Sequence, residues 1–217
     1  MTRILDCTDE GARANAITDA AAAVRRGELV VLPTDTVYGL GADAFSPHAV
    51  RRLLSAKGRS RNVPVPVLVG SWRTVNGLVE ELTDTAKDLI AAFWPGALTL
   101  VLRQGSGLTW DLGDTRGTVA VRMPLHPVAL DLLKETGPLA VSSANRHGAA
   151  ATATAQDAEA QLGSAVAVYL DGGRTDEHVA STIVDLTGVR PRVLREGAVD
   201  RARLAEVAGE LAEPDDE

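Results

Sequence analysis

The chain has 217 residues, 45% of them hydrophobic, and a formal net charge of −7 at pH 7. This length and composition predict one soluble globular domain with a sizeable core. No apolar run approaches the ~20 residues that a membrane-spanning helix needs. The first residues lack the basic start and apolar stretch of a secretory signal, and the single cysteine, Cys7, excludes an internal disulfide. We therefore expect a cytoplasmic protein with no membrane partner.

The charge is unevenly distributed along the chain. The last twelve residues carry six acids and no base, so the remainder is nearly neutral. A nearly neutral body argues against broad, charge-driven binding of nucleic acid. It leaves room for a local basic site, because residues 51–61 contain five Lys or Arg and no acid.

The expected helices and strands alternate irregularly. In chain order we predict a helix at 10–26, a strand at 28–32, a polar loop at 34–41, a helix at 47–57, a strand at 64–69, a helix at 84–93, strands at 98–102 and 118–121, a helix at 127–135, a strand at 139–141, a helix at 155–162, strands at 166–170, 182–185 and 193–194, and a helix at 200–211. The two prolines in 64–69 cannot donate to a ladder, so we expect this strand at an edge or a bulge. Some strands follow one another with no helix between them. We therefore predict a mixed parallel and antiparallel α/β sheet flanked by helices.

Four clusters of hydroxyls, amides or cations follow the ends of predicted elements. They are residues 33–36, 57–59 and 142–145, together with Arg122 at the end of a strand. Ligands of α/β sheets bind at strand ends, and Lys and Arg there can hold anionic oxygens. The sequence has no P-loop, dinucleotide fingerprint, nucleophile elbow or zinc motif. This combination suits a reaction at phosphate that is catalysed by positioning and charge stabilisation.

Each cluster also has a purely structural interpretation. The threonines after Pro33 and the residues 142–145 could form ordinary side-chain turns. The cations of 57–59 could be a solvated helix end that complements the helix dipole, and Arg122 could be a surface charge. Spacing alone does not decide between these interpretations.

Longer segments around the clusters supply a more specific signal. They are PTDTVYGLGADA (33–44), AKGR (56–59), FWPGALTLVL (93–102), VAVRMPLHP (119–127), SSAN (142–145), STIVDL (181–186) and VLREGAV (193–199). In this order and spacing the chain resembles the YrdC-like family of threonylcarbamoyl-AMP synthases, over roughly residues 10 to 200. The resemblance implies one synthase domain over 1–212 with a concave basic cavity. From its acidic composition we expect a disordered tail at 213–217.

The resemblance also implies roles for individual residues. The family's KxR pattern falls on Lys57 and Arg59, which become the expected catalytic residues and phosphate contacts. The positions expected to bind L-threonine are Thr36, Arg122 and Ser181. The other positions expected to bind ATP are Thr118, Val141, Ser143, Asn145 and Arg195, with Val141 acting through its backbone.

The implied reaction makes threonylcarbamoyl-AMP and pyrophosphate from L-threonine, bicarbonate and ATP, for the threonylcarbamoyladenosine modification of tRNA. Mg²⁺ is expected with the ATP phosphates and not as a protein-held metal. A separate threonylcarbamoyl transferase complex would take the product, so tRNA would be only an indirect partner.

The sequence departs from the family pattern at two points. Val63 stands where Asn is common and Leu68 where His is common, which leaves the side-chain contacts there open. A first alternative is a related nucleotide- or RNA-binding regulatory protein without activity. A second is carbamoyl transfer to another acceptor, as in the related domain of hydrogenase maturation proteins. The retained KxR pattern and the SxN pattern of Ser143 and Asn145 disfavour the inactive regulatory protein. The absence of zinc cysteines disfavours carbamoyl transfer to another acceptor.

Overall fold

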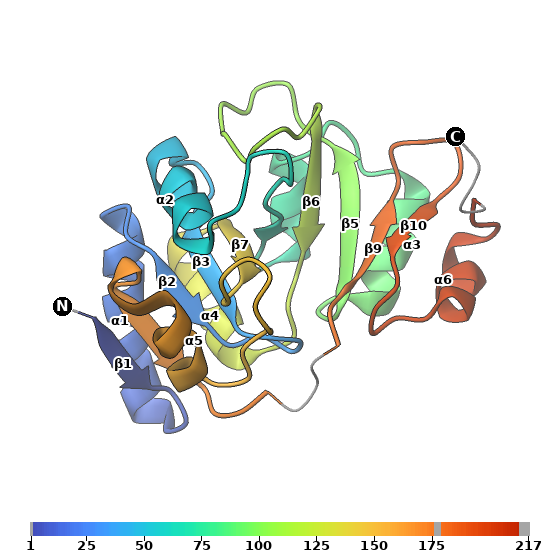
Figure 1. Cartoon of the computed structure of the whole chain (residues 1–217). Coiled ribbons are helices and arrows are strands. Elements are labelled where there is room, and N and C mark those ends of the chain that lie inside the picture. Colours follow the sequence, from blue (N-terminus) through green and yellow to red (C-terminus); the bar gives the residue numbers. More distant parts are fainter. Residues whose placement is uncertain (1, 176–178, 213–217) are drawn as a thin grey trace.

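The computed structural model describes residues 2–175 and 179–212, and Figure 1 shows their arrangement around one sheet. The expected tail at 213–217 lies outside the described residues. The helices are α1 (Glu10–Arg25), α2 (Pro47–Lys57), α3 (Asp84–Phe93), α4 (Pro127–Thr136), α5 (Ala155–Leu162) and α6 (Arg201–Ala208), with short 3₁₀ helices at Trp72–Gly77 and Gly163–Ala165. No helix among the described residues combines the length and apolarity needed to cross a membrane.

Ten strands from the described residues form one mixed sheet. They are β1 (Arg3–Asp6), β2 (Val30–Leu32), β3 (Gly39–Asp43), β4 (Val67–Leu68), β5 (Leu98–Arg103), β6 (Thr118–Arg122), β7 (Leu139–Ser143), β8 (Val168–Asp171), β9 (Thr182–Asp185) and β10 (Arg192–Arg195). Their order across the sheet is β1-β8-β2-β3-β7-β4-β6-β5-β9-β10. The pairs β1–β8, β2–β8, β4–β6 and β5–β9 are parallel and the others antiparallel. The predicted mixed α/β sheet is confirmed.

Side-chain caps fix the starts of the main helices. The Asp9 carboxylate accepts from the Ala12 N–H at 2.9 Å at the start of α1, and Ser46 caps α2 ahead of Pro47. Thr83, Thr154 and Asp200 cap α3, α5 and α6 in the same way. Each cap satisfies a backbone N–H that the helix itself leaves unpaired, which is why these starts could be predicted from sequence.

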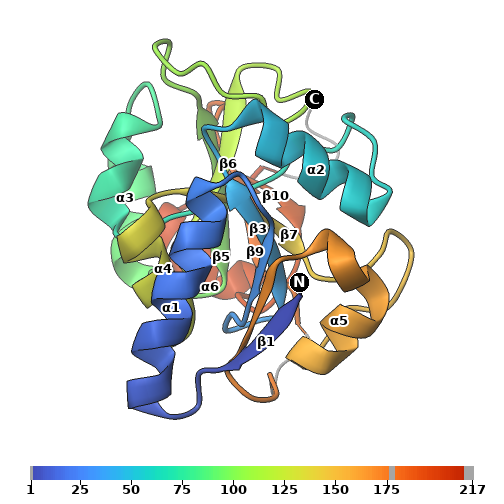
Figure 2. The same ribbon diagram turned by 90° about the vertical axis from the view of Figure 1, so that its left-hand side faces the viewer.

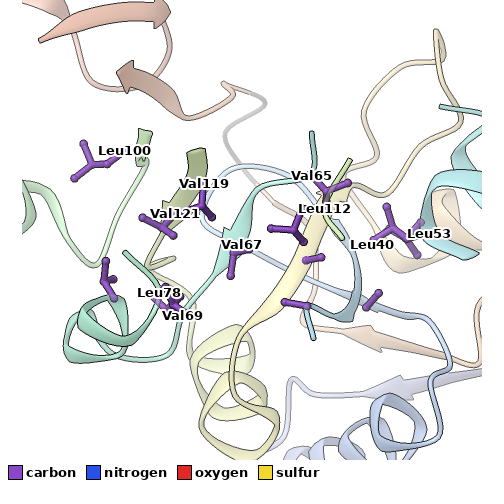
Figure 3. Packing of buried hydrophobic residues seen from close by; sticks show 14 of the residues in the cluster. Leu40, Leu53, Val65, Val67, Val69, Leu78, Leu100, Leu112, Val119 and Val121 are labelled. Carbon is purple, nitrogen blue, oxygen red and sulfur yellow. The ribbon is translucent and has the colours of Figure 1, made fainter. Parts of the chain in front are cut away.

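The helices cover the sheet through two buried apolar clusters. In one, α1 and α4 pack together on residues of β2, β7 and β8, and Figure 2 shows these two helices side by side. In the other, α2, α3 and α5 pack on strands from β3 to β9. Figure 3 shows part of the second cluster, in which Leu40 lies near Leu53, Val121 lies near Leu100, and Val67 lies between these two pairs.

The prediction that 64–69 is an edge strand or a bulge is wrong. The strand β4 is central, between β7 and β6. Its two prolines precede the strand itself, and Pro66 takes part through its carbonyl, which accepts from the Val141 N–H at 2.9 Å. A proline lacks only the N–H, so this carbonyl contact costs the sheet nothing.

Two strands were not predicted. The segment expected as a loop at 34–41 contains the start of β3, and β1 lies near the N-terminus. The sequence of β3 is GLGAD, which has low strand propensity. Packing restricts position 39 to glycine, because a Cβ there would lie 2.6 Å from Cγ1 of Val141 on the neighbouring β7.

Candidate active site

A cavity of about 620 Å³ lies over strands β3, β5, β6, β7, β9 and β10 and is partly covered by the segments at 59–66 and 112–118. The predicted site residues that line it are Thr36, Arg59, Thr118, Arg122, Val141, Ser143, Ser181 and Arg195. Three arginines and no Asp or Glu are among its lining residues within the described chain. Lys57 and Asn145 lie behind Ser143 and do not line it. The fold thus brings together residues up to 159 positions apart in sequence.

The turn after β2 presents Thr36 to the cavity. The Thr34 hydroxyl donates to the Val37 carbonyl at 2.6 Å and accepts from the Thr36 N–H at 3.2 Å. The structural interpretation of a side-chain turn therefore holds for Thr34. The Thr36 hydroxyl instead accepts from Nη1 of Arg122 at 3.0 Å, so Thr36 is linked directly to the cation of the site.

Arg122 is buried and held from three directions. Its Nε donates to the Gly96 carbonyl at 2.9 Å, Nη1 to Thr36, and Nη2 to the Asp35 carboxylate. Asp35 also accepts from the Leu125 N–H at 2.9 Å. Burial lowers the pKa of Arg122, and Asp35 opposes that shift. A guanidinium has five N–H donors, so two remain beyond these three bonds. The alternative of a surface charge is wrong for Arg122.

Lys57 is a buried cation that braces the turn after β7. Its side chain is 4% exposed, and Nζ donates to the carbonyls of Ser143 and Asn145, the latter at 2.7 Å. The pKa of Lys57 is lowered to about 8 by burial and then by the charge of Arg59. The expectation of a solvated helix end is therefore wrong at this position. Nζ also donates to the Ser143 hydroxyl at 3.2 Å, so each of its three protons has a protein acceptor and Lys57 acts on the turn.

Arg59 and the 143–145 turn complete this side of the cavity. The Gly58 C-cap, in the left-handed region at φ 63°, ends α2 and leads into Arg59. Nη1 of Arg59 donates to the Ser142 hydroxyl at 3.1 Å, and burial lowers the pKa of Arg59. The Asn145 amide donates to the carbonyls of Arg146 and Ala149, so its N–H groups stabilise its own loop.

On the opposite side of the cavity, Arg195 is held by the carbonyl and the hydroxyl of Ser181. Arg195 donates from Nε and Nη2 to the Ser181 carbonyl, at 3.0 and 2.7 Å, and from Nη2 to the Ser181 hydroxyl at 3.0 Å. Gly197 allows this approach, because a Cβ there would lie 2.3 Å from the Ala180 carbonyl oxygen. The expected threonine position Ser181 and the expected nucleotide position Arg195 are therefore in direct contact.

Thr118 and Val141 line the cavity in different ways. The Thr118 hydroxyl donates to the Thr115 carbonyl at 2.8 Å and so stabilises the loop beside it. The backbone of Val141 was expected to contact the nucleotide, and its N–H already donates to the Pro66 carbonyl. Val141 is one of the residues that line the cavity. Of the two departures from the family pattern, Leu68 is a buried apolar part of the wall and Val63 an exposed one.

Trp94, His126 and Cys7 do not line the cavity. The Trp94 indole donates to the Leu98 carbonyl at 2.7 Å. His126 occupies the N-cap position of α4 without a side-chain cap bond. Burial raises the pKa of the Cys7 thiol to about 11, so the thiol is unreactive near neutral pH.

Sequence reasoning assigned no role to Thr99, nor to Asp35 and Ser142 individually, although these two lie in the clusters 33–36 and 142–145. Asp35 holds Arg122, and the Thr99 and Ser142 hydroxyls line the cavity. A signal for Thr99 was present in LTLVL, where one hydroxyl interrupts an otherwise apolar strand. A buried polar group needs a partner, which is a reason to ask what Thr99 contacts.

The fold and this arginine-lined cavity define a mixed α/β protein suited to small anionic ligands. The Sua5/YciO/YrdC family model, described as telomere recombination, matches residues 22–197. The chain therefore belongs to the Sua5/YciO/YrdC family.

Several members of this family align with most of the chain. A Mycobacterium tuberculosis protein, provisionally named a threonylcarbamoyl-AMP synthase, is 58% identical over 209 residues, which are 96% of each protein. The threonylcarbamoyl-AMP synthase of Vibrio cholerae is 36% identical and covers 83% of this chain and 97% of its own length. Pyrococcus abyssi Sua5, solved in complex with L-threonine, superposes with a TM-score of 0.92 at 36% identity. It aligns with 97% of this chain, which spans 62% of the Sua5 length.

Proposed function

We propose that this protein is a threonylcarbamoyl-AMP synthase, which converts L-threonine, bicarbonate and ATP into threonylcarbamoyl-AMP and pyrophosphate. The observation that carries the proposal is the convergence of Arg59, Arg122 and Arg195 on one cavity with Ser and Thr hydroxyls. The 58% identical relative and the threonine complex of Sua5 support the same reaction.

The chemistry has two balanced steps. The threonine amine attacks the carbon of bicarbonate, a C–N bond forms, and water leaves to give a carbamate. A carbamate oxygen then attacks the α-phosphorus of ATP and breaks the bond to the bridging oxygen of the β-phosphate, so that pyrophosphate leaves. Carboxylate, carbamate and triphosphate must meet in one place. Reducing their mutual repulsion and aligning them is the main task of the protein.

The position of each residue in the cavity suits it to a particular group of the substrates. The two remaining N–H donors of Arg122, beside Thr36, suit the carboxylate of L-threonine. Arg59 and Ser143 on one wall and Arg195 on the other suit phosphate oxygens. Lys57 contributes by holding the carbonyls of Ser143 and Asn145. Mg²⁺ would enter with ATP as part of the substrate, since phosphate oxygens are its preferred ligands.

The product is a reactive mixed anhydride, so a separate transferase must accept it. We propose that a threonylcarbamoyl transferase complex uses it to modify tRNA, and that tRNA is reached only through that partner. The nearly neutral body of the chain is consistent with tRNA being bound by the transferase partner and not by this protein.

The test is pyrophosphate release by the purified protein from Mg²⁺–ATP, with L-threonine, L-serine or no amino acid, each with and without bicarbonate. We expect release that requires both threonine and bicarbonate. ATP binding without any release under these conditions would contradict the proposal and favour a nucleotide-binding protein without activity.

A further inference from the structure

Thr99 is a buried hydroxyl on the cavity wall that none of the roles above uses. It is 3% exposed and lies on β5 between Leu98 and Leu100, which are fully buried. Its Oγ1 lies 2.8 Å from Oγ of Ser181, itself 6% exposed. The parallel pairing of β5 with β9 sets this contact, because Leu98 pairs with Thr182. A valine would fill the same volume in an apolar strand, so the hydroxyl is the informative part of this residue.

The number of available protons indicates which hydroxyl donates in the contact between Thr99 and Ser181. Arg195 can only donate, and its Nη2 takes one lone pair of the Ser181 hydroxyl at 3.0 Å. The single Ser181 proton can then go either to Thr99 or into the cavity. If Thr99 donates to Ser181, the serine proton is available to a ligand. An anionic oxygen accepts only, so its arrival favours this second arrangement.

We propose that Thr99 is a positioning residue for the amino-acid substrate. It donates to Ser181, which also receives a proton from Arg195, so the Ser181 hydroxyl directs its own proton to an anionic oxygen of the amino acid. Two donors onto one hydroxyl polarise it and strengthen the bond that it donates. This inference rests on the proposed function for the identity of the ligand, and its test measures binding separately from turnover.

The test is the dissociation constant of L-threonine by calorimetry for Thr99→Val, Thr99→Ser, Ser181→Ala and the double variant Thr99→Val/Ser181→Ala. We expect Thr99→Val to weaken binding about three- to tenfold, the effect of one neutral hydrogen bond. Thr99→Ser keeps the hydroxyl and should bind like the wild type. Because Thr99 acts through Ser181, adding Thr99→Val to Ser181→Ala should weaken binding no further.

A matched control is Thr136→Val, which removes a hydroxyl bonded to the Leu132 carbonyl on α4, away from the cavity. It should leave binding unchanged. Unchanged binding in Thr99→Val, an equal loss in Thr99→Ser, or an undiminished loss in the Ser181→Ala background would each overturn the inference. The same holds if the wild type binds no threonine. Threonine binding by a wild type that releases no pyrophosphate would refute the proposed function and still allow the Thr99 comparison to be decided.

Discussion

The buried pair of Arg122 and Asp35 allows stability and substrate binding to be separated. Their side chains are 8% and 15% exposed, and Arg122 also donates to Gly96 and Thr36. The variant Arg122→Met removes these bonds and leaves the Asp35 carboxylate with only the Leu125 N–H. Breaking one half of such a pair costs about 3–5 kcal/mol, because an uncompensated charge stays buried.

This cost should be visible in thermal unfolding. For a protein of this size, 1 kcal/mol lowers the Tm by about 2–4 °C, so Arg122→Met should lower it by about 6–20 °C. The KM for L-threonine should also rise at least tenfold, equivalent to about 1.4 kcal/mol or more of lost binding. Adding Asp35→Asn removes the stranded charge, and the double variant should regain much of the lost Tm without regaining threonine affinity.

Two outcomes would refute this reasoning. An unchanged Tm in Arg122→Met would mean that the pair makes no net contribution to stability. Recovery of threonine affinity in the double variant would mean that Arg122 acts by neutralising Asp35 and not by contacting the substrate. Thermal scans and pyrophosphate release on the same preparations decide both points.

The remaining predictions concern the two walls of the cavity. Arg59→Ala should reduce turnover at least tenfold, which corresponds to about 1.4 kcal/mol of transition-state stabilisation, and should leave the Tm nearly unchanged. Full activity of this variant in pyrophosphate release would argue against a contact between Arg59 and phosphate. The pKa of Lys57, lowered to about 8, means that its proton is present below and lost above that pH. The activity advantage of the wild type over Lys57→Met should therefore narrow as the pH rises from 7 to 9, and a constant ratio would contradict this. Gly197→Ala places a Cβ against backbone and should cost about 1–3 kcal/mol in urea unfolding, whereas Gly188→Ala, with its nearest contact at 3.8 Å, should cost little. Equal effects of these two glycine variants would show that the close approach at 197 is relaxed in solution.

Local rules correctly gave the elements whose signals lie within a few residues. The helix starts at Asp9, Ser46 and Thr154 could be predicted because a short side chain caps a backbone N–H three residues on. The motif segments likewise indicated most of the cavity wall, and eight of the ten predicted site residues line it.

Tertiary structure alone decided the features that depend on distant partners. The segment GLGAD is a strand because β2 and β7 pack on both sides of it and leave no room for a Cβ at Gly39. The central place of β4 depends on a carbonyl of Pro66 meeting β7. Lys57 has the sequence pattern of an exposed helix end, but in the folded chain the turn at 143–145 encloses it. Composition, caps and motifs are written in the sequence, but a buried contact is defined by both of its partners. The sequence contains both partners of each buried contact, but only the folded chain shows that they lie together.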